Sequence, residues 1–94
     1  MKTGFIYIIS NKKRTTFYIG VTTDLEGRIL KHRKGIGSAF SSQYKLTDLV
    51  YFEKFPNITR AILREKQLKN WRREWKLHLI KSKNPDLKDL YWDL

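Results

Sequence analysis

Two aromatic strings near the N-terminus carry side chains that could take part in chemistry. Phe5-Ile6-Tyr7 and Tyr18-Ile19-Gly20 place two phenols eleven residues apart, each inside a run of β-forming residues. A polar, basic turn separates the strings, and strands joined by a short connection pair antiparallel, which would bring Tyr7 and Tyr18 together on one sheet. Taken alone, each is also an ordinary packed strand tyrosine. A phenol is a poor base at neutral pH unless a nearby cation lowers its pKa from about 10.

A basic residue and a histidine follow on a predicted helix. Arg28 comes ten residues after Tyr18, and His32 comes one helical turn later on the same face. A guanidinium can hold two phosphate oxygens at once and stabilise the charge of a transition state. Without further context, Arg28 is also interpreted as a solvated helix residue and His32 as a partly buried one.

Glu65 is the carboxylate that a helical arrangement singles out. On an ideal helix over residues 60–80 it falls at the edge of one apolar face and is the only acid beside a basic stripe. The apolar face comprises Ala61, Leu68, Trp71, Trp75 and Leu79, and the stripe comprises Lys69, Arg72, Arg73 and Lys76. An i,i+4 pair with Lys69, worth about 0.2–0.5 kcal/mol, is the ordinary interpretation of this glutamate.

The residue pattern predicts the strands and helices that position these side chains, beginning with the first half of the chain. Residues 4–10 and 16–22 are rich in Ile, Phe, Tyr, Val and Thr and are predicted strands. A helix is expected over 24–34, with Thr23 as its N-cap and Glu26 reaching back in a capping box. Residues 38–44 are expected to form one short helical turn.

The second half of the scaffold continues the alternation. A third strand is expected over 46–55, then a long helix capped by Asn57 or Thr59 and running to about Lys81. A last short helical turn is expected to start at Asn84-Pro85, with Leu87, Leu90 and Trp92 packing back on the core. The prediction is one α/β (α+β) domain over residues 1–94, a small three-stranded, mainly antiparallel sheet flanked by helices in the order β-β-α-β-α.

Composition favours a polyanionic partner. Twenty Lys and Arg against nine Asp and Glu give a net charge of +11, and each neutralised phosphate releases condensed counterions. The absence of cysteine excludes disulfides and cysteine-based zinc sites. The apolar stretch at the N-terminus is too short for a signal peptide or a membrane span, so a cytoplasmic location is expected. In so small a domain the site should be an open face or a shallow cleft.

The two strings and the element order resemble the GIY-YIG nuclease family, over about residues 4–92. Four further strings resemble the short stand-alone bacterial members: Gly35 to Phe40, Leu49 to Glu53, Arg64 to Lys69, and Asn84 to Leu90. The resemblance implies metal-dependent cleavage of nucleic-acid phosphodiesters. It implies that Tyr7 positions the attacking water or accepts its proton, that Tyr18 contacts the phosphate or a metal-bound water, and that Arg28 holds phosphate oxygens.

The resemblance assigns the remaining site residues as well. His32 is expected to hydrogen-bond Tyr7, the phosphate or the leaving group, and Glu65 to ligate a single Mg²⁺ or Mn²⁺, which needs only one or two carboxylates beside water and phosphate oxygens. Asn84 is expected to support the metal or the substrate, although an Asn-Pro turn also explains it. Phe5 replaces the first glycine of the family name, and Val21 stands where some members carry a lysine, so another group must activate the tyrosine here.

The expected function is a divalent-metal-dependent endonuclease acting on nucleic acid, DNA in the first place, in repair or processing. Its expected nucleic-acid contacts are Lys69, Arg72, Arg73, Lys76, Arg33 and Lys34. A non-catalytic, basic nucleic-acid-binding module, RNA- or ribosome-associated, is the alternative. Phosphate contacts do not read bases, so selectivity is expected to come from the shape of the substrate or from a protein partner.

Overall fold

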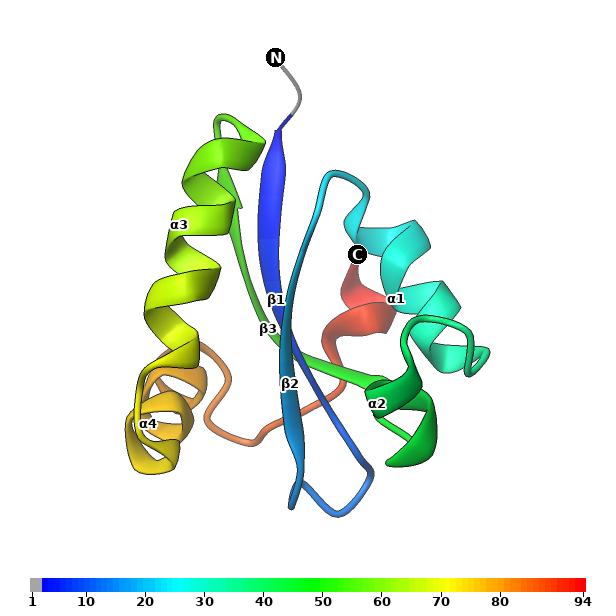
Figure 1. Cartoon of the computed structure of the whole chain (residues 1–94). Coiled ribbons are helices and arrows are strands. Elements are labelled where there is room, and N and C mark those ends of the chain that lie inside the picture. The colour runs from blue at the N-terminus through cyan, green and yellow to red at the C-terminus, as the bar shows by residue number, and fades with distance from the viewer. Residues whose placement is uncertain (1–2) are drawn as a thin grey trace.

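Three segments rich in branched and aromatic residues form the strands β1 (Gly4–Ser10), β2 (Phe17–Thr22) and β3 (Asp48–Phe55). In the computed structural model, which describes residues 3–94, these strands make one antiparallel sheet in the order β2-β1-β3. Both β2 and β3 pair with β1, the middle strand. Figure 1 shows helices on both sides of this sheet. The predicted α+β fold with three strands is confirmed.

The register sorts the strand residues into two faces. Tyr7 lies opposite Gly20, and Ile9 lies opposite Tyr18, so the two phenols share one face of the sheet. Ile6 and Ile8 point to the other face. In β3, Val50 has no partner in β1, because Ile8 pairs with Tyr51 and Ile9 pairs with Leu49. Val50 is therefore the extra residue of a β-bulge.

Two helices cover each face. Helices α1 (Leu25–Arg33) and α2 (Ala39–Gln43) lie on the face that carries the phenols, and α3 (Ile58–Lys69) and α4 (Arg73–Lys83) lie on the other (Figure 1). A final 3₁₀ turn, η1 (Leu90–Asp93), lies beside α1 (Figure 1). Each helical face has its own apolar core: Ile6, Ile8, Ala61, Leu68 and Ile80 on the α3–α4 side, and Tyr7, Ile9, Leu25, Ile29 and Leu49 on the α1 side.

The helix starts and stops differ in part from the prediction. Asp24, not Thr23, caps α1, because its side chain accepts a hydrogen bond from the Gly27 N–H. Asn57 caps α3 as expected, accepting from the Arg60 N–H. Ser38 begins the short helix α2, which confirms the expected turn over 38–44.

The predicted long helix to Lys81 is wrong, because it is two helices. The last turn of α3 tightens, with N–H groups of Asn70 and Trp71 donating to the carbonyls of Gln67 and Leu68. Arg72 then has extended backbone with ψ 155°, and α4 starts at Arg73. The apolar period continues across the break because Trp71 and the α4 residues pack on the same core, so periodicity alone did not reveal it.

The C-terminal segment also corrects the prediction. Asn84 ends α4 as its C-cap, and the short helical turn comes later, at Leu90–Asp93, where the Asp89 side chain accepts from the Tyr91 N–H. Leu90 and Tyr91 pack on the α1-side core, whereas Trp92 is 74% exposed and does not. Within residues 3–94, no helix is long and apolar enough to cross a membrane.

Candidate active site

Tyr7 is the centre of the site, and the sheet is built around its ring. The residue is 1% exposed and leans across β2 over Gly20, its partner in the register. A Cβ atom at Gly20 would lie 2.3 Å from both Cζ and Oη of Tyr7. Only glycine leaves room for the ring, so the last residue of the Tyr18-Ile19-Gly20 string supports the tyrosine of the first string through packing.

The Tyr7 hydroxyl has two side-chain partners, both from α1. Its Oη lies 2.8 Å from Nε2 of His32, which is also buried, and accepts a hydrogen bond from Nε of Arg28 at 3.2 Å. Arg28 and His32 lie one turn apart on α1, as their spacing predicted. The structure therefore brings Tyr7, Arg28 and His32 into direct contact.

Helix α2 supplies a partner that sequence reasoning missed. Oγ of Ser41 lies 2.8 Å from Nδ1 of His32, on the side of the ring opposite Tyr7. Ser41 is buried in the first turn of α2, and Ser38, the N-cap, contacts it through both its hydroxyl and its carbonyl. A Cβ atom at Gly37 would lie 2.2 Å from Nδ1 of His32, so Gly37 closes tightly over the ring.

Burial sets the ionisation of this cluster. Desolvation raises the pKa of Tyr7 above its ordinary value and outweighs the lowering effects of the hydrogen bond and charge of Arg28. Arg28 alone therefore does not give Tyr7 the lowered pKa that a phenol needs to act as a base at neutral pH. Burial, with the Arg28 charge second, lowers the pKa of His32 to about 4. At neutral pH Tyr7 keeps its proton and His32 is uncharged.

Tyr18 connects this cluster to α3. Its ring lies 5.9 Å from the His32 ring and stacks against Phe40 of α2, with 6.0 Å between centroids. Nζ of Lys69 lies 5.9 Å from the centre of the Tyr18 ring. Tyr18, Phe40, Lys69 and Lys76 line a hollow of about 420 Å³ beside the edge strand β2, with Phe17 and Ile19. The hollow is an open surface site of the kind expected for this size of domain.

Glu65 approaches the same edge from α3. Its carboxylate lies 3.4 Å from Nζ of Lys69, which confirms the expected i,i+4 pair, and its side chain is 16% exposed. The negative charge of Glu65 acts on the pKa of Tyr7, raising it as one of the smaller contributions. Tyr7, Tyr18, Arg28 and His32, drawn from β1, β2 and α1, thus form one cluster, and Glu65 of α3 lies beside it through its pair with Lys69, whose Nζ lies over the Tyr18 ring.

A metal at Glu65 would have one protein carboxylate. Residues 3–94 contain no group of three or more His, Asp or Glu side chains placed to hold an ion. Mg²⁺ commonly keeps several waters and takes one or two carboxylates plus substrate phosphate oxygens. A partly exposed, single carboxylate whose partner Lys69 lines an open hollow fits that mode of binding and does not fit a closed structural metal site.

Asn84 lies outside this cluster in its contacts. Its amide nitrogen donates to the carbonyls of Val50 and Lys88, and its amide oxygen accepts from the Lys88 N–H. The carbonyl of Val50 belongs to the bulged residue, which the bulge leaves without a partner in β1. These bonds give Asn84 a structural role, and no contact in the described chain connects it with Tyr7, Tyr18, Arg28, His32 or Glu65.

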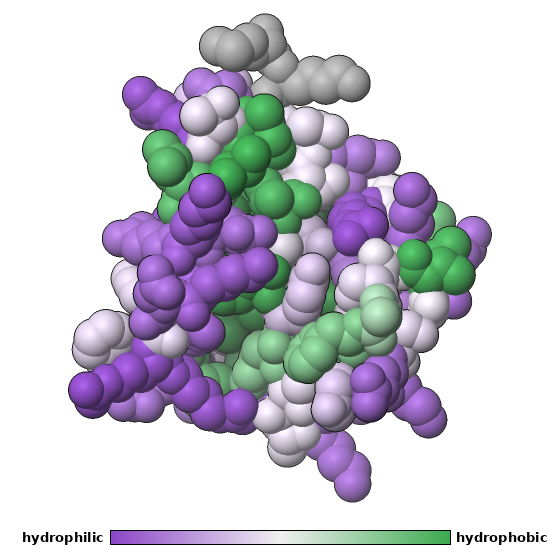
Figure 2. Space-filling view, viewed as in Figure 1, coloured by the Kyte–Doolittle hydropathy of each residue, from purple (hydrophilic) through white to green (hydrophobic). Residues whose placement is uncertain are grey.

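Some of the basic residues expected to bind nucleic acid contact other groups of the protein, and others line an open hollow. Arg33 pairs with Asp89 at 2.7 Å, and Arg73 donates to the Thr15 carbonyl. Arg72 lies over the ring of Trp75. Lys69 and Lys76 line the hollow beside Tyr18. Figure 2 shows hydrophilic side chains gathered over α3 and α4 at the left of this view.

A second basic hollow lies on the other side of His32. Its volume is about 530 Å³, and its wall shares His32 and Ser41 with the cluster. Five cationic side chains and no carboxylate line it: Lys12, Lys13, Arg33, Lys34 and Lys45. Lys12 pairs with Asp48 and Arg33 with Asp89, whereas Lys13, Lys34 and Lys45 have no ion pair within residues 3–94.

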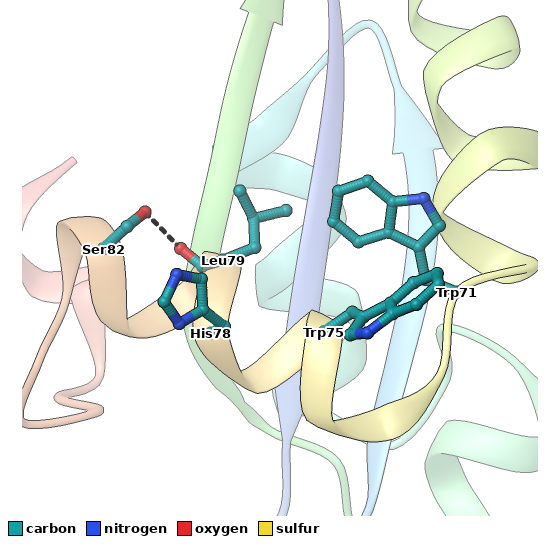
Figure 3. A pocket seen from close by; sticks show the side chains of 5 residues that line it. All are labelled: Trp71, Trp75, His78, Leu79 and Ser82. Atoms are coloured by element: carbon teal, nitrogen blue, oxygen red, sulfur yellow. Dashed lines mark hydrogen bonds between the residues drawn. The ribbon is translucent and has the colours of Figure 1, made fainter.

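A third hollow is apolar and separate from the chemistry. Trp71, Trp75 and Leu79 line it together with His78 and Ser82, at the junction of α3 and α4 (Figure 3). The Ser82 hydroxyl donates to the Leu79 carbonyl, and the two indole rings meet edge to face with 6.2 Å between centroids. It shares no residue with the cluster around Tyr7.

Comparisons with known proteins show what this chain is similar to. The sequence profile described as the GIY-YIG catalytic domain matches residues 3–78. A UPF0213 protein of Staphylococcus saprophyticus is 36% identical over 80 residues, covering 85% of this chain and 96% of the relative. A UPF0213 protein of Clostridium perfringens is 39% identical and covers 86% of both chains. The solution NMR structure of a UPF0213 protein from Bacillus halodurans aligns with a TM-score of 0.59 and 29% identity, over 93% of this chain and 92% of that one.

Proposed function

The chain belongs to the GIY-YIG family, a family of nucleases, and from that premise we propose that it is a divalent-metal-dependent endonuclease. Its proposed substrate is a nucleic-acid phosphodiester, DNA in the first place, and its proposed setting is repair or processing in the cytoplasm. The observation that supports this most is the contact set around Tyr7, in which a phenol, an imidazole and a guanidinium meet beside a basic hollow.

Arg28 is proposed to bind the phosphate. Its Nε atom holds Tyr7, and it makes no ion pair within residues 3–94, so its terminal amino groups have no carboxylate partner there. A guanidinium offers two parallel donors to phosphate oxygens and stabilises the extra charge of the pentacovalent transition state. Because Tyr7 is only 1% exposed, water would reach its hydroxyl after Arg28 turns from Tyr7 toward the phosphate.

Glu65 is proposed to hold the metal ion, and Tyr18 to contact the phosphate or a metal-bound water at the hollow. Bound there, Mg²⁺ or Mn²⁺ would polarise the phosphate and neutralise the leaving oxygen. Binding requires Glu65 to exchange its contact with Lys69 for the ion, which frees the Lys69 ammonium for a phosphate. Tyr7 is proposed to orient the attacking water and to receive its proton.

The test is a cleavage assay paired with a binding assay. Purified protein is incubated with supercoiled, branched and single-stranded DNA, and with structured RNA, in Mg²⁺ or Mn²⁺. Glu65→Gln is expected to abolish cleavage and to leave nucleic-acid affinity unchanged or slightly higher, because a negative charge leaves a basic surface. Glu74→Gln, an exposed acid in the first turn of α4, is the matched control and should cleave normally.

Two results would contradict the proposal. Cleavage retained by Glu65→Gln would remove Glu65 from the mechanism. Tight binding by the unaltered protein without cleavage of any of these substrates in either metal would favour the alternative, a non-catalytic nucleic-acid-binding module.

A further inference from the structure

The hydroxyl of Tyr7 can donate its proton to only one described partner. Tyr7 Oη accepts from Nε of Arg28, which always carries a proton, and its other partner is Nε2 of His32. If His32 carried its proton on Nε2, Tyr7 would accept two hydrogen bonds and its own buried proton would have no acceptor. Buried donors without acceptors are rare and costly. Tyr7 therefore donates to Nε2, and the ring proton of neutral His32 lies on Nδ1.

Ser41 is placed to receive that ring proton. Its Oγ lies 2.8 Å from Nδ1 of His32, and its own hydroxyl proton has an acceptor in the Ser38 carbonyl at 3.3 Å. The hydroxyl group of Ser41 could serve either tautomer of His32, so the choice is made at the Tyr7 end of the ring. Once that choice is made, Ser41 is the group that keeps the Nδ1 proton satisfied in a buried place.

Close contacts leave the imidazole ring of His32 little room to move. Gly37 closes over Nδ1 so tightly that a Cβ atom there would overlap the ring. Ser41 is fixed in turn by the N-cap of α2, where Ser38 Oγ accepts from the Ser41 N–H at 3.1 Å and lies 2.9 Å from Ser41 Oγ. The backbone around Gly37 and at the N-terminus of α2 therefore fixes the hydrogen-bonded series of side chains that runs from Tyr7 through His32 and Ser41 to Ser38.

We propose that Ser41 is a positioning residue of this site: it accepts the Nδ1 proton of His32 and so stabilises the tautomer that Tyr7 selects, in which Nε2 is free to take the proton of Tyr7. The catalytic part of this inference rests on the proposed nuclease function, whereas the tautomer does not. In the proposed cleavage step, the attacking water gives a proton to Tyr7 Oη while the Tyr7 proton moves to His32 Nε2. The hydroxide forms the new bond to phosphorus, and the leaving oxygen departs with the electron pair of the broken bond and takes a proton from solvent.

In the proposed relay, His32 is the group that activates the tyrosine in a chain that carries Val21 where some family members carry a lysine. A phenol whose pKa is raised by burial is a weak proton acceptor on its own, and this chain has no lysine directly after its second string. A neutral imidazole in contact with the phenol removes the need for a tyrosinate before the reaction, because Tyr7 passes one proton on as it receives another.

The tautomer is measured first, by nitrogen-15 NMR of the imidazole rings in the unaltered protein without substrate. The chain has two histidines, and the exposed His78 provides an internal reference for a solvated ring. For His32 we expect a protonated Nδ1 and an unprotonated Nε2. In Ser41→Ala the Nδ1 proton loses its acceptor, so part of the population should shift to the Nε2-protonated tautomer, although Tyr7 still favours an unprotonated Nε2. A protonated Nε2 in the unaltered protein would overturn the inference, whether or not the protein cleaves nucleic acid.

The catalytic part is measured by single-turnover cleavage. Ser41→Ala should lower the rate at saturating substrate by about 10-fold or more, which is part of the roughly 10²–10⁴-fold that general base catalysis contributes as a whole, with little change in KM. Ser41→Thr, which keeps the hydroxyl, should restore the rate, and Ser82→Ala, at an exposed serine of the third hollow away from the cluster, should leave it unchanged. A normal rate in folded Ser41→Ala would refute the positioning role. If Ser41→Ala does not fold, the nitrogen-15 spectrum of the unaltered protein still decides the tautomer.

Discussion

At the level of single residues, burial gives the central pair opposite and complementary properties. Tyr7 keeps a proton to donate because its pKa is raised, and His32 keeps a lone pair to accept it because its pKa is lowered to about 4. The surroundings of His32 reinforce this. Arg28 on its own helix and the lysines lining the adjoining hollow are all positive, the facing phenol Tyr7 keeps its proton, and Tyr18 faces His32 with its ring.

The lowered pKa of His32 predicts how stability depends on pH. The unfolded chain binds a proton at His32 below about pH 6.5, whereas the folded protein does so only near pH 4. The free energy of unfolding should therefore rise as pH rises from about 4 to about 6.5 and level off above, with a slope of at most about 1.4 kcal/mol per pH unit. Urea unfolding between pH 4 and 8 measures it.

His32→Asn should remove most of this slope, and His78→Gln should keep it. Burial raises the carboxyl pKa values of Asp48 and Glu53, but hydrogen bonds and ion pairs outweigh it and hold both below the ordinary range. The stability that these carboxylates contribute is lost as pH falls below about 5, so the His32 slope is read between about pH 5 and pH 6.5. An equal slope in His32→Asn would show that other groups cause it.

How far the sequence predicted the site depends on where each partner lies in the chain. Tyr7, Tyr18, Arg28 and His32 come together through a hairpin and one helix turn, which are short-range rules. Ser41 was missed because serine is common and its role depends on a turn that folds α2 back over His32. Arg33 was predicted to bind nucleic acid, but its partner Asp89 lies 56 residues away, beyond any local pattern.

At the level of elements, the break between α3 and α4 changes the basic stripe. A continuous helix would align Lys69, Arg72, Arg73 and Lys76 along one face. The break instead turns Arg73 toward the β1–β2 connection and Arg72 toward Trp75. Lys69 and Lys76 still line one hollow, because that hollow spans both helices. The strands and the first helix were predictable from short patterns, whereas this break depends on how both helices pack on a shared core.

Asn84 gives an element-level prediction that separates two roles. Its amide joins the end of α4 to the bulged carbonyl of Val50 and to the turn at Lys88. Asn84→Ala should lower the free energy of unfolding by about 1–3 kcal/mol, because it leaves buried backbone groups unpaired. The cleavage rate per folded molecule should stay within about threefold of normal, a band of about 0.65 kcal/mol in barrier height.

Asn70→Ala is the control for this variant, because Asn70 is an exposed asparagine at the end of α3. Its effect on stability should stay within about 0.5 kcal/mol. A stable Asn84→Ala protein that has lost cleavage would instead support the catalytic role first expected from the resemblance. Urea midpoints and cleavage rates measured on the same preparations decide between the two roles.

At the level of the whole molecule, positive charge lies on two sides of the cluster. One hollow beside Tyr18 carries Lys69 and Lys76, and the other beside His32 carries Lys13, Lys34 and Lys45. A polyanion bound over the cluster would contact both. The net charge of +11 and the absence of a carboxylate in either lining make this the natural path for a phosphate backbone.

The salt dependence of binding tests this path. The logarithm of the binding constant should fall linearly with the logarithm of salt concentration, by about 0.9 per phosphate bound on duplex DNA. Replacing Lys13, Lys34 and Lys45 with alanine should flatten the slope by about 0.9 for each phosphate that the variant no longer neutralises, equally for unrelated sequences. The control replaces Lys54, Lys66 and Lys81, exposed lysines that line neither hollow. Equal slopes in both triple variants would place the bound strand elsewhere.

The stack at Arg33 has a practical consequence for protein engineering. The guanidinium of Arg33 lies 4.7 Å from the centre of the Tyr91 ring and 5.0 Å from that of Trp92, while it pairs with Asp89. The last residues of the chain thus act as a latch on the end of α1, the helix that carries Arg28 and His32. A fusion partner, a surface linker or a truncation at Leu94 would disturb these contacts with Arg33. Through α1, such a change would alter the orientation of Arg28 and His32, although the contacts themselves lie away from the reacting groups.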